Sequence, residues 1–123
     1  MINQNTRSIV CVATAAGKTH DFALFKSSRL VVDPDIEMLG DTGYQGLAKL
    51  HSNSLTPHRR SKHNPLSHEQ KQHNHDLSAR RIVIEHVLRT LKRFRILSCT
   101  YRNRRKRFGL RLNLLAAITN LHK

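Results

Sequence analysis

Two carboxylates stand out in this sequence because of the segments that carry them. Asp41 follows Leu39 and Gly40 and opens a turn of sequence Thr-Gly-Tyr, and Glu85 lies within the basic stretch 80–89. The chain has 22 Lys and Arg against 8 Asp and Glu, so an acid near its basic part needs a specific role. Carboxylates from two segments can share a divalent metal ion, and Mg²⁺ prefers such oxygen ligands. We therefore take Asp41 and Glu85 as candidate metal ligands and catalytic residues.

Positive charge is concentrated in the second two-thirds of the chain. Residues 1–41 carry 4 basic and 5 acidic side chains, whereas residues 42–123 carry 18 basic and 3 acidic ones, and the formal net charge is +14. Such an excess raises affinity for polyanions through counterion release and steers association. The sequence therefore predicts nucleic acid as the partner, with an anionic membrane as the weaker alternative.

Length and composition restrict the class of protein. A chain of 123 residues with 38% hydrophobic residues predicts one domain with a small core. The sequence has no apolar run of about 18 residues and no apolar signal-peptide segment at its start, which predicts a cytoplasmic protein that does not span a membrane. Cys11 and Cys99 belong to no Cys-x-x-Cys pair, so we expect two buried thiols. The nine histidines lack neighbouring sulfur ligands, which disfavours a structural zinc site.

Short strands and turns are expected around Asp41. Residues 6–14 are apolar and β-branched, which predicts a strand buried on at least one face. Asp21 is expected to cap a short helix over residues 22–26. Residues 36–40 predict a second strand that ends at Asp41. Its side chain would then lie at the carboxyl edge of a strand, where open α/β sheets place their sites.

Long helices are expected in the second half of the chain. Pro57 and Pro65 exclude a continuous helix between residues 51 and 76, and a long helix is predicted from Ser67, its N-cap, to about Leu97. Its buried stripe consists of Ile84, Val87, Leu88, Leu91 and Phe94. A final helix is predicted over 108–121. The helical spacing alone favours a simple role for Glu85, a surface ion-pair ladder with Arg81 and Arg89 worth about 0.3 to 0.5 kcal/mol per pair.

Three ordered blocks of sequence carry a resemblance to a known family. The blocks are His20-Asp21-Phe22 with Leu24-Phe25, then Gly40-Asp41-Thr-Gly-Tyr44, then Arg81-x-x-Ile84-Glu85-His86 leading to Leu91-Lys92-Arg93-Phe94. In this order they resemble the bacterial insertion-sequence transposases of the DDE type, over essentially the whole chain. Each block alone is weakly specific. Their order and spacing together make the match.

The resemblance implies a fold, a chemistry and a partner. The fold is RNase H-like α/β, here truncated to a partial mixed sheet with long C-terminal helices. Three acids bind Mg²⁺ or Mn²⁺ for cleavage and joining of DNA ends, and by residue-wise match Asp41 is the second acid and Glu85 the third. The first lies on a strand upstream of residue 1, and Asp21, Asp33 and Asp35 do not match its place. The resemblance thus implies a C-terminal part of a transposase catalytic domain that is inactive alone.

The same resemblance implies DNA, the ends of the insertion element, as the partner, and is compatible with a homo-oligomer of the full-length parent. Basic side chains that flank the two acids in sequence are the predicted DNA contacts: Arg59, Arg60, Lys62, Arg80, Arg81, Arg89, Lys92 and Arg93. Residues 102–107 form a denser basic run that is either a further contact or a solvated turn. Contacts of this kind go mainly to phosphates, so binding should be sensitive to salt. A small, non-catalytic nucleic-acid-binding protein is the alternative function.

Overall fold

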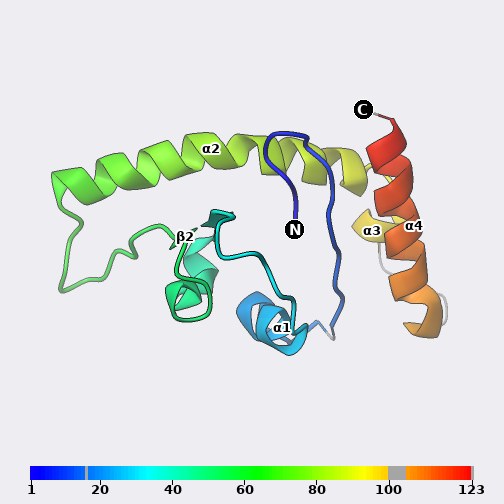
Figure 1. The fold of residues 1–123 in the computed structure, drawn as a ribbon, viewed down its shortest axis with the longest axis horizontal. Coiled ribbons are helices and arrows are strands. Elements are labelled where there is room, and N and C mark those ends of the chain that lie inside the picture. Colours follow the sequence, from blue (N-terminus) through cyan, green and yellow to red (C-terminus); the bar gives the residue numbers. More distant parts are fainter. Residues whose placement is uncertain (16, 100–104, 123) are drawn as a thin grey trace. The chain divides into compact units, whose positions relative to one another are not determined.

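The computed structural model describes residues 1–15, 17–99 and 105–122 (Figure 1). These residues divide into two compact units, one formed by residues 1–14 and 82–123 and the other by residues 15–81. In chain order the elements, with η for a 3₁₀ helix, are α1 (Asp21–Ser27), β1 (Met38–Leu39), η1 (Thr42–Tyr44), η2 (Leu47–Lys49), β2 (Ser54–Leu55), α2 (His68–Lys92), α3 (Arg95–Ser98), η3 (Arg105–Arg107) and α4 (Phe108–Leu121). The combination of helices with a small parallel sheet is an α/β structure.

The sheet in residues 15–81 consists of two short parallel strands. Met38 of β1 pairs with Ser54 of β2, and Leu39 pairs with Leu55. The N–H of Gly40 donates to the carbonyl oxygen of Leu55 at 2.8 Å, which extends the pairing to the residue before Asp41. The structure thus confirms a strand within residues 36–40, but the strand covers only Met38–Leu39. The expected mixed sheet is not formed by the described residues, because both strands of this sheet run in the same direction.

Tight packing around Gly40 fixes the backbone immediately before Asp41. A Cβ atom at Gly40 would lie 2.8 Å from Cγ2 of Thr56 and 3.1 Å from both Cδ2 of Leu47 and Cβ of Tyr44. Leu47 is the most deeply buried of these side chains, with 1% of its surface exposed. Any larger residue would force these side chains to shift, so the end of β1 is held by packing as well as by hydrogen bonds.

Helix α1 is capped by His20, and the prediction that Asp21 is the cap was wrong. Nδ1 of His20 accepts the N–H of Phe22 at 3.2 Å, while Asp21 is the first residue of the helix. The charge of Asp21 is still favourable there, because the N-terminus of a helix is the positive end of its dipole. The rings of Phe22 and Phe25 meet Tyr44 edge-on at centroid distances of 5.7 and 6.1 Å, which joins α1 to η1.

The core of the other unit gathers residues from three parts of the chain. Ile9 of the N-terminal segment, Val87 and Leu91 of α2 and Ala116 of α4 are buried together. Val87 and Leu91 belong to the predicted stripe of the long helix, and their burial confirms that part of it, whereas Leu88 remains 40% exposed. Helix α4 has the bounds expected from the sequence.

The prediction of a strand over residues 6–14 was wrong in the structure. Its only β pairing among the described residues is an isolated antiparallel bridge between Ile2 and Ile9. Ile9 is buried, but Val10 is 64% exposed. The composition of the segment suits a strand, but the neighbouring backbone that bonds it at Ser8, Val10 and Cys11 is only residues 1–3. A pairing this short does not build a regular ladder.

Helix α2 begins where the sequence predicts and ends earlier. Oγ of Ser67 accepts the N–H of Gln70, and Oε1 of Gln70 accepts the N–H of Ser67, which is the reciprocal pattern of a capping box. The helix ends at Lys92 instead of Leu97, and Phe94 adopts an extended conformation before α3 begins.

Two further observations concern the thiols and the membrane. Cys11 is half-buried and Cys99 is exposed, so the prediction that both are buried was wrong. Cys99 is the C-cap residue of α3. None of the helices in the described part of the chain is both long and apolar enough to span a membrane.

Candidate functional site

Asp41 lies two residues after the end of β1 and caps the helical turn η1, as the sequence predicts for an acid at a strand edge. Its Oδ1 atom accepts the N–H of Thr42 at 2.5 Å and the hydroxyl of Thr42 at 3.2 Å. Nη1 of Arg81, on α2, lies 3.3 Å from the same oxygen. Among the described residues no donor contacts Oδ2 of Asp41, and the side chain is 53% exposed. One carboxylate oxygen is therefore held by hydrogen bonds, whereas the other has no partner among the described residues.

The surroundings of Asp41 favour its charged form. Partial burial would raise the pKa of this carboxyl group, but the hydrogen bond from the backbone of Thr42 and the charge of Arg81 outweigh it and lower the pKa below its usual value. The Thr42 hydroxyl and the Arg81 hydrogen bond act in the same direction. Asp41 is thus a carboxylate at neutral pH, which is the form that a metal ion binds.

The loop that carries Asp41 rests on α1. The ring of His20 lies close to Gly43, with its Cε1 3.7 Å from where a Cβ would stand. Burial raises the pKa of Tyr44, and the charges of Asp21 and Asp41 raise it further, so its hydroxyl stays neutral. The first two sequence blocks therefore meet in space within residues 15–81, around the turn after Asp41.

A second ion pair precedes β1 and was missed by the sequence reasoning. Arg80 binds the carboxylate of Glu37, and each of the two side chains is 39% exposed. The hydrogen bond from Arg80 lowers the pKa of Glu37, more than slight burial raises it. Neighbouring arginines of α2 thus bind the acids on either side of β1. The available signals were the positions of Glu37 and Asp41 on either side of a short apolar strand, and the two consecutive arginines on the predicted long helix.

Glu85 lies on α2, four residues after Arg81, and its side chain is exposed. Glu85 belongs to the unit of residues 1–14 and 82–123, whereas Asp41 belongs to the unit of residues 15–81. The expected ion-pair ladder along the helix is absent from the described residues, because Arg81 pairs with Asp41 and Glu85 forms no ion pair. No group of three or more His, Cys, Asp or Glu side chains gathers within the described residues, so the shared metal site stays a prediction.

The predicted DNA contacts fall into three sets. Arg59, Arg60 and Lys62 are exposed in the connector between β2 and α2. Arg80 and Arg81 are half-buried and form ion pairs with Glu37 and Asp41 respectively. Arg89, Lys92 and Arg93 are exposed at the end of α2. Of the basic run at 102–107, residues 102–104 lie outside the described residues.

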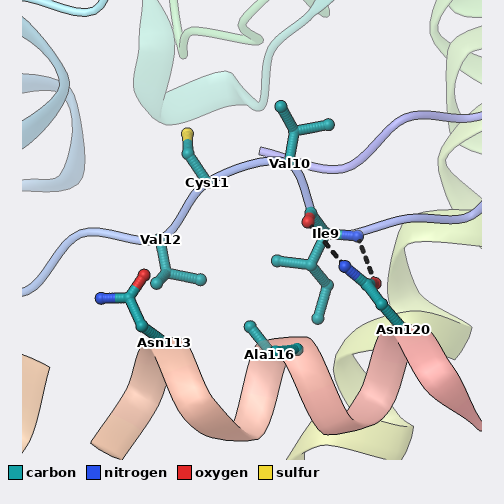
Figure 2. A pocket seen from close by; sticks show the side chains of 8 residues that line it. Ile9, Val10, Cys11, Val12, Asn113, Ala116 and Asn120 are labelled. Atoms are coloured by element: carbon teal, nitrogen blue, oxygen red, sulfur yellow. Dashed lines mark hydrogen bonds between the residues drawn. The ribbon is translucent and has the colours of Figure 1, made fainter. Parts of the chain in front are cut away.

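A small pocket in the unit of residues 1–14 and 82–123 is lined by apolar and polar groups alike (Figure 2). It has a volume of about 160 Å³ and lies between the N-terminal segment and α4, with Val12 and Ala116 among its lining residues. None of the predicted site residues lines it, and it presents no charged group. It is therefore not a candidate for the chemistry predicted from the sequence.

The sequence is similar to a known protein family and to a known relative. The family model described as DDE superfamily endonuclease matches residues 1–120. A relative from Microchaete diplosiphon, described as a probable transposase for insertion sequence element IS702, is 48% identical over 120 residues. That match covers 98% of this chain and 44% of the relative, so the chain spans less than half the length of that protein. No solved structure matches the chain significantly.

Proposed function

Because the chain belongs to the family of DDE superfamily endonucleases, we propose that it is the C-terminal part of an insertion-sequence transposase catalytic domain. Its parent cleaves and joins DNA ends by metal-dependent phosphoryl transfer. The observation that carries the proposal is the place of Asp41, a charged and partly exposed carboxylate just past the carboxyl end of β1. Sites of open α/β sheets lie at this edge.

Asp41 and Glu85 are the proposed ligands for Mg²⁺ or Mn²⁺. The donor set suits such ions, because both residues offer carboxylate oxygens and Oδ2 of Asp41 has no partner among the described residues. The bound ions would supply charge stabilisation and activation of the attacking hydroxyl group. The chain's own contribution is to hold Asp41 in its charged form, through Thr42 and Arg81.

The parent domain is proposed to have an RNase H-like fold. Support comes from the parallel pairing of β1 with β2, followed by the long helix α2 that carries Glu85. The rest of the proposed sheet would include a strand that bears the family's first Asp, which has no counterpart in residues 1–123. For this reason the 123-residue chain is proposed to be inactive alone.

DNA is the proposed partner, at the ends of the insertion element, and the cytoplasm is the proposed place of action. The exposed cations Arg59, Arg60 and Lys62, and those at the end of α2, support phosphate contacts. Association of several copies is proposed only for the full-length parent.

Metal binding and cleavage by the purified chain test the proposal directly. Calorimetric titration should show Mn²⁺ binding that is weakened in Asp41→Asn and in Glu85→Gln, with Asp35→Asn as a matched control. Incubation of supercoiled plasmid with Mn²⁺ should show no nicking by the chain. Mn²⁺ binding that is indifferent to both substitutions would remove the proposed site, and nicking that both substitutions abolish would refute inactivity.

The alternative function is that of a small basic nucleic-acid-binding protein without a metal site. The net charge of +14 is the observation that favours it. Salt-sensitive binding of duplex DNA together with no Mn²⁺ binding at Asp41 or Glu85 would select this alternative.

A further inference from the structure

Arg81 forms an ion pair with Asp41, the carboxylate that the proposed function assigns to a metal ion. Its Nη1 atom lies 3.3 Å from Oδ1 of Asp41. Oδ1 already accepts two hydrogen bonds from Thr42, so three donors converge on this one oxygen. The guanidinium is the better buried partner, at 26% exposed against 53% for Asp41. Arg81 is thus the cation that balances Asp41 in this structure.

We propose that Arg81 and the divalent ion compete for Asp41, so that Arg81 is a positioning residue which must be drawn away before the ion is fully bound. The inference rests on the proposed function, because it assumes that Asp41 binds the ion. The sequence predicted Arg81 as a phosphate contact or as an ion-pair partner of Glu85, and not as the partner of Asp41.

The competition follows from the charges. The guanidinium group of arginine carries a fixed positive charge, so this charge remains when an ion arrives. A doubly charged ion on Oδ2 would stand close to this fixed positive charge, and repulsion would weaken ion binding. The repulsion ends when the guanidinium moves to another anion.

A DNA phosphate is the natural alternative anion. Guanidinium groups bind phosphate through paired, charge-assisted hydrogen bonds, which replace the single contact with Asp41. A DNA phosphate that binds Arg81 would therefore strengthen ion binding at Asp41. By linkage, the ion would strengthen DNA binding by the same factor. Arg81 would make the site bind its ion most tightly when DNA is present.

The neighbouring ion pair provides a matched control. Arg80 binds Glu37 on the other side of β1, so Arg80→Gln removes the same charge and one ion pair at the adjacent position of α2. It leaves the contact between Arg81 and Asp41 in place. Any effect of overall charge or of helix anchoring should appear in both variants, whereas competition for Asp41 should appear only in Arg81→Gln.

The test is the Mn²⁺ affinity of the full 123-residue chain without DNA. We expect Arg81→Gln to bind Mn²⁺ about two- to five-fold more tightly than wild type, the size expected for loss of one partly exposed ion pair. Arg80→Gln should differ little, and Arg81→Lys, which keeps the charge, should stay close to wild type. Mn²⁺ should broaden the amide NMR signal of Thr42, which locates the ion beside Asp41. Circular dichroism verifies that each variant is folded.

The outcomes separate the inference from the proposed function. Mn²⁺ binding that requires Asp41 but is unchanged or weaker in Arg81→Gln would overturn the inference and leave the proposed function intact. Equal tightening in Arg80→Gln and Arg81→Gln would also overturn it, since a general charge effect would then suffice. Mn²⁺ binding that does not depend on Asp41 in any variant would remove both.

A second measurement uses a short DNA duplex. At matched ionic strength, Mn²⁺ should improve the affinity of wild type for the duplex more than that of Arg81→Gln. An equal effect of Mn²⁺ on the two proteins would contradict the exchange of Arg81 between Asp41 and phosphate.

Discussion

The side chain of Asn120 forms two hydrogen bonds with the backbone of Ile9, 111 residues earlier in the chain (Figure 2). Oδ1 of Asn120 accepts the N–H of Ile9 at 2.8 Å, and Nδ2 donates to its carbonyl oxygen at 3.0 Å. The carboxamide satisfies both backbone groups of Ile9 just as a residue of a neighbouring strand would. This pair of bonds ties the N-terminal segment to α4, next to the buried side chain of Ile9.

Replacement of Asn120 should loosen the N-terminal segment. Asn120→Ala leaves the N–H and C=O of Ile9 without partners, which should cost about 1 to 3 kcal/mol of unfolding free energy. Asn113→Ala is the control on the same helix, because the side chain of the exposed Asn113 donates to the carbonyl oxygen of Gly109 within α4, and it should change stability by less than about 0.5 kcal/mol. Urea denaturation measures both, and equal losses would contradict the role of Asn120.

Substitution of Gly40 should disturb the end of β1. In Gly40→Ala the new methyl group would meet Thr56, Leu47 and Tyr44, and overpacking of this kind costs about 1 to 3 kcal/mol. Gly17→Ala is the control, because no atom lies within 4 Å of a Cβ at that position. Thermal unfolding followed by circular dichroism should show a lower midpoint for Gly40→Ala alone, and an unchanged midpoint would show that the neighbours can move aside.

DNA binding should depend on the exposed connector between β2 and α2. The triple change of Arg59, Arg60 and Lys62 to Gln should weaken duplex binding and reduce the slope of log affinity against log salt by roughly 2 to 3. A matched triple change of Arg7, Lys18 and Arg29, which lie in the part of the chain without net positive charge, should reduce the slope less. Fluorescence anisotropy over a range of salt concentrations compares them, and equal slopes would show that only total charge matters.

Stability should fall at acid pH through Glu37 and Asp41. The folded state lowers the pKa of both groups, so their contribution is complete above the unfolded values of about 4 and is lost as the pH falls through the lower folded values. Glu37→Gln should therefore reduce the loss of unfolding free energy between about pH 6 and about pH 3. Asp35→Asn, whose carboxylate forms no ion pair among the described residues, should leave that loss unchanged. Urea unfolding at each pH measures the loss, and identical curves for wild type and Glu37→Gln would exclude the Arg80 pair as a cause.

Local sequence signals were sufficient where a structure depends on neighbouring residues. The apolar spacing of residues 108–121 gave the bounds of α4, and Ser67 marked the start of α2. The Gly-Asp-Thr-Gly turn placed Asp41 just past a strand. Each of these features is decided within a few residues, by helical periodicity, a cap or a turn.

Local signals failed where a distant partner decides the outcome. Residues 6–14 have the composition of a strand, but in the structure Asn120 supplies backbone partners to Ile9 where a neighbouring strand would. The cap of α1 is an exception, because a local contact between the ring of His20 and the N–H of Phe22 replaced the expected cap Asp21. Helical spacing paired Arg81 with Glu85, whereas the fold pairs it with Asp41, 40 residues away.

The sequence by itself determined the family, the basic character and the two acids of interest, because these depend on residue identity and order. Only the tertiary structure decided which ion pairs form. Arg80 pairs with Glu37, and Arg81 pairs with Asp41. Such pairing depends on how α2 packs beside β1, and the distance between charges sets its strength. That distance is a property of the fold and cannot be read from spacing along the chain.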